Sequence, residues 1–409
     1  MKTAKKNILL LPMLAFCSFL VGFDAIATVP LLPAISASTD MPMRSGGLLY
    51  ACYAAAYAVT APLMGYLSDR WSRKGILLIG LALFGVSTAL MGTGETFAAL
   101  IFFRILTGIG AGMVEPAVYA IAGDHYAYED RGRAMGVITA ALIASSVVGV
   151  PIAGAVGEMA SWNRTFRMIA LLILLALAVA SAAIPKRRPG QAGHGPGREA
   201  PAGSPFRLVF ANRSVFFSLL GSLLYFGALQ GMFALAGAYY FTFYGLGSGE
   251  TGLLLMAAGA ASIAGSLLGG KWADRRRKSR VVAVASLAAG VFVFLLGLMT
   301  FNLWVSILLH VLWAAFYAAG QAAFTTLVSE LDPSARGTVL SFNSSAMYIG
   351  AGAASGLAAV LLQAADFWAV GLLCGAANAL VVMIVLTVIR ERRTGVGSSH
   401  NNNRTGKSG

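Results

Sequence analysis

Twelve long apolar stretches constrain the fold more than any other feature of this 409-residue sequence. Each is long enough for a helix to cross a hydrocarbon layer of about 30 Å. The chain is 58% hydrophobic and 11% charged, which is more apolar surface than a soluble core could bury. The sequence therefore predicts an all-α integral membrane protein. The stretches lie near 8–32, 46–67, 75–93, 97–122, 134–157, 165–184, 214–240, 250–270, 281–300, 303–328, 337–362 and 366–389.

Positive charge follows these stretches in alternation. Of the 30 Lys and Arg residues, 26 fall in segments on one side of the predicted membrane, three in loops on the other side, and one, Arg104, within a span. Because cytoplasmic loops are enriched in Lys and Arg, both termini are predicted to be cytoplasmic. The net charge of +14 then indicates topology and a contact with anionic membrane lipid, with no nucleic acid as a partner. The first stretch resembles a signal peptide, but its removal would leave eleven spans, so we expect it to be retained.

A ten-residue pattern occurs twice, as GYLSDRWSRK at 65–74 and GKWADRRRKS at 270–279, an offset of 205 residues. The same offset relates Arg131 to Arg336. Each copy follows the second stretch of a set of six, which predicts a duplicated six-helix unit. We therefore expect an N-terminal bundle over 1–184, a cytoplasmic linker over 185–213, a C-terminal bundle over 214–390 and a disordered cytoplasmic tail over 391–409.

The repeated pattern resembles the loop that follows helix 2 in the major facilitator superfamily, and the resemblance covers about 8–390. Arg104-Ile-Leu-Thr-Gly108-Ile-Gly110-Ala-Gly112 is similar to the family's helix 4 pattern. Gly149-Val-Pro151-Ile-Ala-Gly154 resembles the helix 5 pattern of its antiporters, with Val150 inserted between glycine and proline. Asp24 on helix 1 resembles the acid of drug:proton antiporters. The resemblance implies a fold of two pseudo-symmetric six-helix bundles, in which Gly108, Gly112, Gly149, Pro151 and Gly154 serve helix packing.

The resemblance also implies a role for the repeated loop. Asp69 would face the start of helix 11 near 334–338, and Asp274 would lie beside the start of helix 5 near 131–134. Such contacts would hold the outward-open state and break when the halves rock. For the basic residues, the alternative is that they only anchor the topology. The candidate gating residues are Gly65, Asp69, Arg70, Arg73, Arg131, Asp274, Arg275 and Arg336.

Four ionisable side chains other than Tyr and Cys fall inside predicted spans: Asp24, Arg104, Glu115 and His310. A charge at mid-helix costs about 3 kcal/mol on insertion scales, so each requires a reason. Asp24 and Arg104 lie at matching depths, which makes an ion pair reasonable. The pair is either a switch, in which Arg104 changes the proton affinity of Asp24, or a permanent structural contact.

Glu115 follows Arg104 by eleven residues and therefore lies on the same helix face. It is a second proton-coupling site, a hook for a cationic substrate, or a group solvated at the cavity mouth. His310 either lines the substrate cavity or packs inside the bundle through a hydrogen bond. Tyr239, Tyr240 and Tyr244 are expected in the aromatic belt at a membrane interface. The candidate cavity wall consists of Tyr53, Tyr57, Tyr225, Gln230, Tyr317 and His310.

Aromatic rings with a few polar groups and an acid suit bulky amphipathic or cationic small molecules. The expected function is export of such compounds by proton antiport and alternating access, in a monomer of a bacterial cytoplasmic membrane. The alternative is a facilitator or proton-coupled transporter of a sugar, siderophore or other metabolite. No phosphate-binding motif, nucleophile–base pair or metal-ligand spacing occurs, so we expect no enzyme activity, nucleotide, metal or cofactor.

Overall fold

The computed structural model describes residues 9–68, 72–126, 128–184, 212–331 and 336–389. All regular secondary structure in these ranges is helical. Twelve segments are long and apolar enough to cross a membrane, which confirms the twelve predicted spans. They divide into two sets of six, before and after the segment 185–211, as the duplicated pattern predicts.

The first six spans follow the predicted ranges closely. A short 3-10 helix, η1 (Met43–Ser45), precedes the second span. The fifth span is composite, because a π-helical turn, η2 (Ser145–Gly149), separates two α-helices. The helices are α1 (Leu10–Ser38), α2 (Gly47–Ser68), α3 (Arg73–Met91), α4 (Phe97–His125), α5 (Tyr128–Ala144), α6 (Val150–Met159) and α7 (Trp162–Ala183).

The second set repeats this plan with one break of its own. The seventh span is interrupted at Ala234 and Leu235, between α9 and α10. The other spans are single helices. Their bounds are α9 (Arg213–Phe233), α10 (Ala236–Tyr244), α11 (Ser248–Arg275), α12 (Lys278–Leu298), α13 (Leu303–Leu331), α14 (Arg336–Ala364) and α15 (Phe367–Thr387).

Proline chemistry accounts for the break in the fifth span. Pro151 has no backbone N–H, so it cannot donate the helical hydrogen bond to the carbonyl of Val147. The π-helical turn Ser145–Gly149 lies immediately before it and absorbs this interruption. The break divides the span into α5 and α6, which then pack against different partners.

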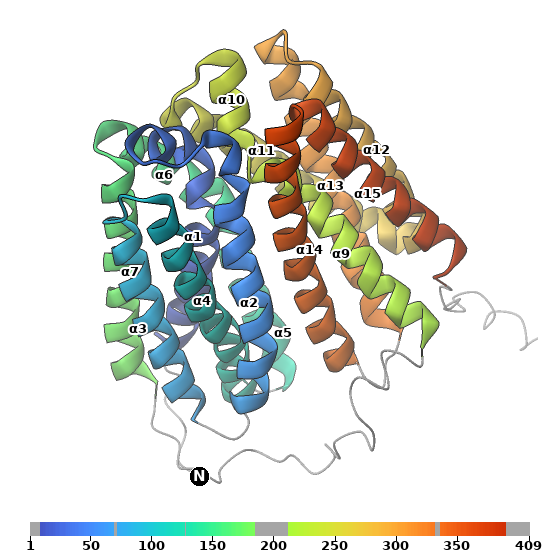
Figure 1. Cartoon of the computed structure of the whole chain (residues 1–409). Helices are drawn as coiled ribbons and strands as arrows, with labels where there is room; N and C mark the ends of the chain where they lie inside the picture. The colour runs from blue at the N-terminus through green and yellow to red at the C-terminus, as the bar shows by residue number, and fades with distance from the viewer. Residues whose placement is uncertain (1–8, 69–71, 127, 185–211, 332–335, 390–409) are drawn as a thin grey trace, which may run out of the picture.

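The two halves meet at one end of the molecule. We call this the closed end; it holds η1, α6, α10 and the turn between α14 and α15. Of the two parts of span 5, α6 rather than α5 packs extensively on α11 of the other half, and α2 packs on α14. At the opposite end, here called the open end, lie the connections α2–α3 and α4–α5, and the halves are farther apart there (Figure 1).

Small residues set the spacing at the closed end. A Cβ atom added to Gly154 would overlap the carbonyl oxygen of Ser248. Likewise, one on Gly47 would overlap the carbonyl of Ser355, and one on Gly237 that of Val29. Each pair joins one half to the other, so the halves touch there backbone to backbone.

Candidate functional site

A buried ion pair lies in the core of the first half. Asp24 of α1 and Arg104 of α4 are 0% and 1% exposed, and Arg104 Nη1 lies 2.9 Å from Asp24 Oδ2. The same nitrogen donates to the backbone carbonyl of Asp24 at 3.1 Å. The predicted proximity of these two side chains is therefore present.

Neighbouring helices complete the surroundings of this pair. Thr88 of α3 donates a hydrogen bond to the second carboxylate oxygen of Asp24, at 3.2 Å. The guanidinium carbon of Arg104 lies 5.3 Å from the ring centre of Phe166 and 5.8 Å from that of Tyr53, within the range of cation–π attraction. Both carboxylate oxygens of Asp24 thus accept hydrogen bonds from protein groups.

The guanidinium of Arg104 is only partly hydrogen-bonded by the described residues. Arg104 Nε and Nη2 and the hydroxyl of Tyr53 are buried and have no hydrogen-bond partner among the described residues. Unpaired polar groups are costly in an apolar interior, and clusters of them mark places that water or a ligand occupies. The ion pair therefore has hydrogen-bonding capacity left for a third participant.

Glu115 lies on the same helix, closer to the open end. Glu115 is 5% exposed. The Ser18 hydroxyl of α1 donates a bifurcated hydrogen bond to both carboxylate oxygens, each at 3.1 Å. Tyr119 follows Glu115 by four residues on α4, and Tyr57, which stacks on Tyr348, packs on α4 beside Gly112. Asp24 and Glu115 thus lie at two positions along one α1–α4 interface.

The residues predicted to line a substrate cavity come from both halves. Tyr225 and Tyr317 stack with ring centres 4.7 Å apart, and the Tyr225 hydroxyl donates to the carbonyl of Tyr317. Across the interface between the halves, Gln230 donates to the hydroxyl of Tyr50 at 2.6 Å. The carbonyl oxygen of the Gln230 side chain is buried and has no partner in the described part of the chain.

A second aromatic pair crosses between the halves. Tyr57 of α2 stacks on Tyr348 of α14 with ring centres 3.9 Å apart and planes inclined by 26°. Tyr348 was not among the predicted wall residues. Its spacing along α14 carries no signal by itself, because the partner ring lies in the other half of the sequence.

The structure corrects the expectation for the tyrosines at the end of span 7. Tyr239 and Tyr240 are 1% and 0% exposed, and so they do not form an interfacial belt. Tyr239 bonds to Ser306, and the Tyr240 hydroxyl lies 3.1 Å from His310 Nδ1. His310 itself is 1% exposed and packs on Trp313. This polar aromatic cluster lies inside the second half, away from Asp24.

The repeated loop is only partly within the described residues. Asp69 and Arg70 lie outside them, and for Arg131, Asp274 and Arg336 the structure describes a helical backbone but not the side chain. Gly65 lies inside α2 rather than in the connection, and Gly270 lies inside α11, where a Cβ atom would meet nothing within 4 Å. Arg275 is exposed.

Equivalent basic residues of the two copies form matching ion pairs. Arg73 begins α3, and its Nη1 lies 2.6 Å from Oδ1 of Asp124 near the end of α4. Lys278, at the start of α12, lies 3.1 Å from Glu330 near the end of α13. Each pair stays within its own half, so these contacts brace the open end of each bundle. The acidic partners escaped prediction because they lie outside the repeated pattern.

The glycines expected to serve packing divide between two interfaces. Gly108 and Gly112 face α2, where Cβ atoms would meet the carbonyl of Tyr53 and the side chain of Thr60. Gly149 faces the ring of Phe23 on α1. Gly154 faces α11 across the two halves, and Pro151 lies beside Gly252 there.

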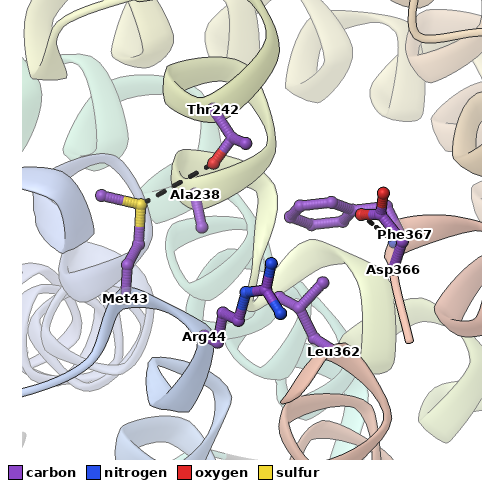
Figure 2. Close-up of a pocket in the computed structure, with 7 residues that line it drawn as sticks. All are labelled: Met43, Arg44, Ala238, Thr242, Leu362, Asp366 and Phe367. Carbon is purple, nitrogen blue, oxygen red and sulfur yellow. Dashed lines mark hydrogen bonds between the residues drawn. The ribbon is translucent and has the colours of Figure 1, made fainter. Parts of the chain in front are cut away.

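The small cavity in Figure 2 lies at the closed end rather than at the ion pair. Its volume is about 130 Å³, and it lies where η1 of the first half meets α10 and the α14–α15 turn of the second. In Figure 2, Met43 reaches toward Thr242, and Arg44 extends beneath Phe367. Ser45 also accepts a hydrogen bond from Gln363 at 3.1 Å. The cavity is a packing gap in the contact that closes this end. Its lining comprises Met43, Arg44, Ala238, Thr242, Leu362, Asp366 and Phe367.

Comparison with known proteins gives concordant matches. Residues 14–355 match the family model of the Major Facilitator Superfamily. An uncharacterized MFS-type transporter of Bacillus subtilis (strain 168), YceJ, is 28% identical over 84% of this chain and 87% of its own length. Multidrug resistance protein 1 of the same organism is 32% identical over 45% of this chain and 48% of its own. A bacterial homologue of the human lysosomal transporter Spinster, solved in an inward-facing and occupied conformation, superposes with a TM-score of 0.77 at 16% identity, covering 94% and 96% of the two chains.

Proposed function

Because this chain belongs to the major facilitator superfamily, we propose that it exports small amphipathic or cationic compounds by proton antiport. It is a transporter rather than an enzyme, and a multi-pass protein of the cytoplasmic membrane. Members of this family bind small-molecule substrates. The proposal adds the direction, the coupling ion and the substrate class.

The observation that carries the proposal is the buried Asp24–Arg104 pair. A carboxylate and a guanidinium deep in a membrane protein are expensive to insert and are functional candidates by default. Arg104 keeps two nitrogens unpartnered among the described residues, so the pair can respond to water or substrate. In the proposed cycle, protonation of Asp24 weakens its bond to Arg104 and accompanies release of substrate to the outside.

The membrane potential supplies energy for this exchange when the exported compound is uncharged. Moving one elementary charge inward yields about 2.3 kcal/mol per 100 mV. A free energy of 1.4 kcal/mol corresponds to a tenfold concentration ratio. One proton per cycle is therefore sufficient for substantial export of an uncharged compound. Exchange of one proton for one monovalent cation moves no net charge, so the proton concentration gradient alone drives it.

The position of the halves supports alternating access. With the open end placed in the cytoplasm, as the Lys and Arg distribution predicts, the two halves are joined at the external end and apart at the internal one. This is the arrangement in which a cytoplasmic substrate would enter. In this proposal 1–184 and 214–390 are the two rocking bundles, and 185–213 links them.

The substrate class rests on the wall residues. Stacked tyrosines contributed by both halves offer large apolar area and negative ring faces, which suit aromatic cations. The match to a protein named for multidrug resistance agrees with this class. The competing proposal is a facilitator or proton-coupled transporter of a sugar, siderophore or other metabolite. A facilitator gives no role to the buried pair, whereas a proton-coupled metabolite transporter would use it in the same way.

Dye efflux tests the proposal. Cells that express wild type, Asp24→Asn or Glu95→Gln are loaded with a fluorescent lipophilic cation and energised, with and without a protonophore. We expect the protonophore to abolish efflux by the wild type and Asp24→Asn to show no efflux. Glu95→Gln should retain efflux, because Glu95 is an exposed residue in the α3–α4 connection. Protonophore-resistant efflux would overturn proton coupling, and the absence of wild-type efflux would favour metabolite transport.

A further inference from the structure

We propose that Glu115, together with Tyr57, Tyr119 and Tyr348, is the subsite that binds the positive group of a lipophilic monocation. The inference rests on the proposed export function and assigns its substrate chemistry to a particular carboxylate. Of the roles that the sequence permits for Glu115, it selects substrate recognition over proton coupling. Asp24 then retains the proton.

The charge of Glu115 is uncompensated within the protein. Its oxygens accept hydrogen bonds from Ser18, a neutral donor, and no Lys, Arg or His lies within ion-pair distance in the part of the chain that the structure describes. The residue is 5% exposed. A buried carboxylate without a cationic partner is costly, and a bound cation would remove that cost.

Asp24 presents the opposite case. It already has a guanidinium at 2.9 Å and a hydroxyl at 3.2 Å, so a substrate cation would compete with Arg104 there. Glu115 follows Arg104 by eleven residues, about 16 Å along the helix at 1.5 Å per residue. The two carboxylates therefore differ in their partners: Asp24 has a cationic partner in Arg104, and Glu115 has none among the described residues.

Aromatic rings around Glu115 define the kind of cation. Tyr119 follows Glu115 by four residues on α4, so the two share one helix face. Tyr57 of α2 packs beside Gly112, three residues before Glu115, and stacks on Tyr348. Ring faces attract cations that carry few hydrogen-bond donors, such as quaternary ammonium and phosphonium groups. A single carboxylate matches one positive charge. The subsite therefore favours a lipophilic monocation over a polyamine or a divalent metal.

Glu115 lies nearer the open end of α4 than Arg104 does. The hydroxyls of Tyr119 and Thr139 are 3.1 Å apart, with Tyr119 partly exposed and Thr139 exposed on α5. Because Tyr57 belongs to the first half and Tyr348 to the second, a cation held here contacts both moving bodies.

Binding of tetraphenylphosphonium to the purified full-length protein tests the assignment. The measured quantity is the Kd at fixed pH for wild type, Glu115→Gln, Glu115→Asp and the exposed control Glu95→Gln. We expect Glu115→Gln to raise the Kd at least tenfold, Glu115→Asp to raise it less, and Glu95→Gln to leave it unchanged. A wild-type Kd in Glu115→Gln, or no binding by the wild type, overturns the subsite.

The aromatic part has its own pair of variants, which also carries the test if Glu115→Gln does not fold. Tyr348→Phe keeps the ring and should bind tetraphenylphosphonium like the wild type, whereas Tyr348→Ala should bind it at least fivefold more weakly. Equal binding by both variants would contradict the aromatic contribution. Thermal melting and size-exclusion profiles establish that each variant is folded.

Asp24→Asn separates this inference from the proposed function. We expect it to bind tetraphenylphosphonium and to lose proton-driven transport, because binding and coupling use different carboxylates. If Asp24→Asn alone loses binding, Asp24 is the cation site and the subsite is wrong while export stands. If Glu115→Gln loses binding but wild-type transport ignores the proton gradient, the subsite stands and proton antiport is wrong.

Discussion

Residue by residue, the Asp24–Arg104 pair is the contact whose loss should matter most. Removing one partner of a buried ion pair leaves an uncompensated charge and costs about 3–5 kcal/mol. We therefore predict that Arg104→Gln lowers the melting temperature of the purified protein sharply. The double variant Asp24→Asn/Arg104→Gln should recover much of the loss. Additive losses in this double-mutant cycle would show that the two charges do not stabilise one another.

Charged residues inside spans were predictable, but their neutral neighbours were not. Asp24 and Arg104 stand out because charge is rare in apolar stretches, and their matching depths predicted the pairing. Thr88 and Ser18 complete the two carboxylate sites, yet hydroxyl side chains are common in membrane helices and carry no comparable signal. Tyr348 could be assigned only once α2 and α14 were seen to adjoin.

Among the elements, α6 should be sensitive to added volume. A Cβ atom at Gly154 would overlap the carbonyl of Ser248, so Gly154→Ala should push α6 away from α11 and disfavour closure of this end. Pulsed electron paramagnetic resonance between spin labels on α6 and α11 should report a longer mean distance. A transport assay of the same variant should show slower transport. Gly136→Ala on α5 is the matched control, since a Cβ atom there meets nothing within 4 Å. An unchanged distance in Gly154→Ala would contradict the packing role.

Helix number and span limits were predictable from hydropathy, whereas breaks within spans were only partly so. Pro151 signals a disturbed fifth span, although not that the preceding turn is π-helical. The interruption at Ala234 and Leu235 contains neither Gly nor Pro. It occurs where α10 packs closely on α1 through Gly237, a tertiary contact that local sequence does not encode.

For the whole molecule, alternating access requires the closed end to separate. Ser45 and Gln363, hydrogen-bonded across the halves at 3.1 Å, mark a suitable point to prevent this. We predict that Ser45→Cys/Gln363→Cys, in a background without Cys17, Cys52 and Cys374, stops transporting when a short bis-methanethiosulfonate links the two thiols through disulfides. A thiol reductant, which cleaves those disulfides, should restore transport. Each single cysteine variant should transport with or without the reagent. Transport by the cross-linked protein would contradict rocking about the site.

Duplication predicted the two halves, but not which end they share. The internal offset of 205 residues and the alternation of charge are the same in every state of the cycle. The choice of closed end depends on the summed contacts of α2 with α14 and of α6 with α11, which no single residue determines. The matching pairs Arg73–Asp124 and Lys278–Glu330 show that the duplication extends to the bracing of each bundle.

Asp24 lies on α1, Thr88 on α3 and Arg104 on α4, so all three belong to one half. Rigid-body rocking preserves distances inside a half, so the motion by itself does not pull this pair apart. What rocking changes is the compartment whose water borders the first half. The proton exchange would then be timed by hydration, and a solvent isotope effect on transport should persist when the closed-end hydrogen bonds are weakened.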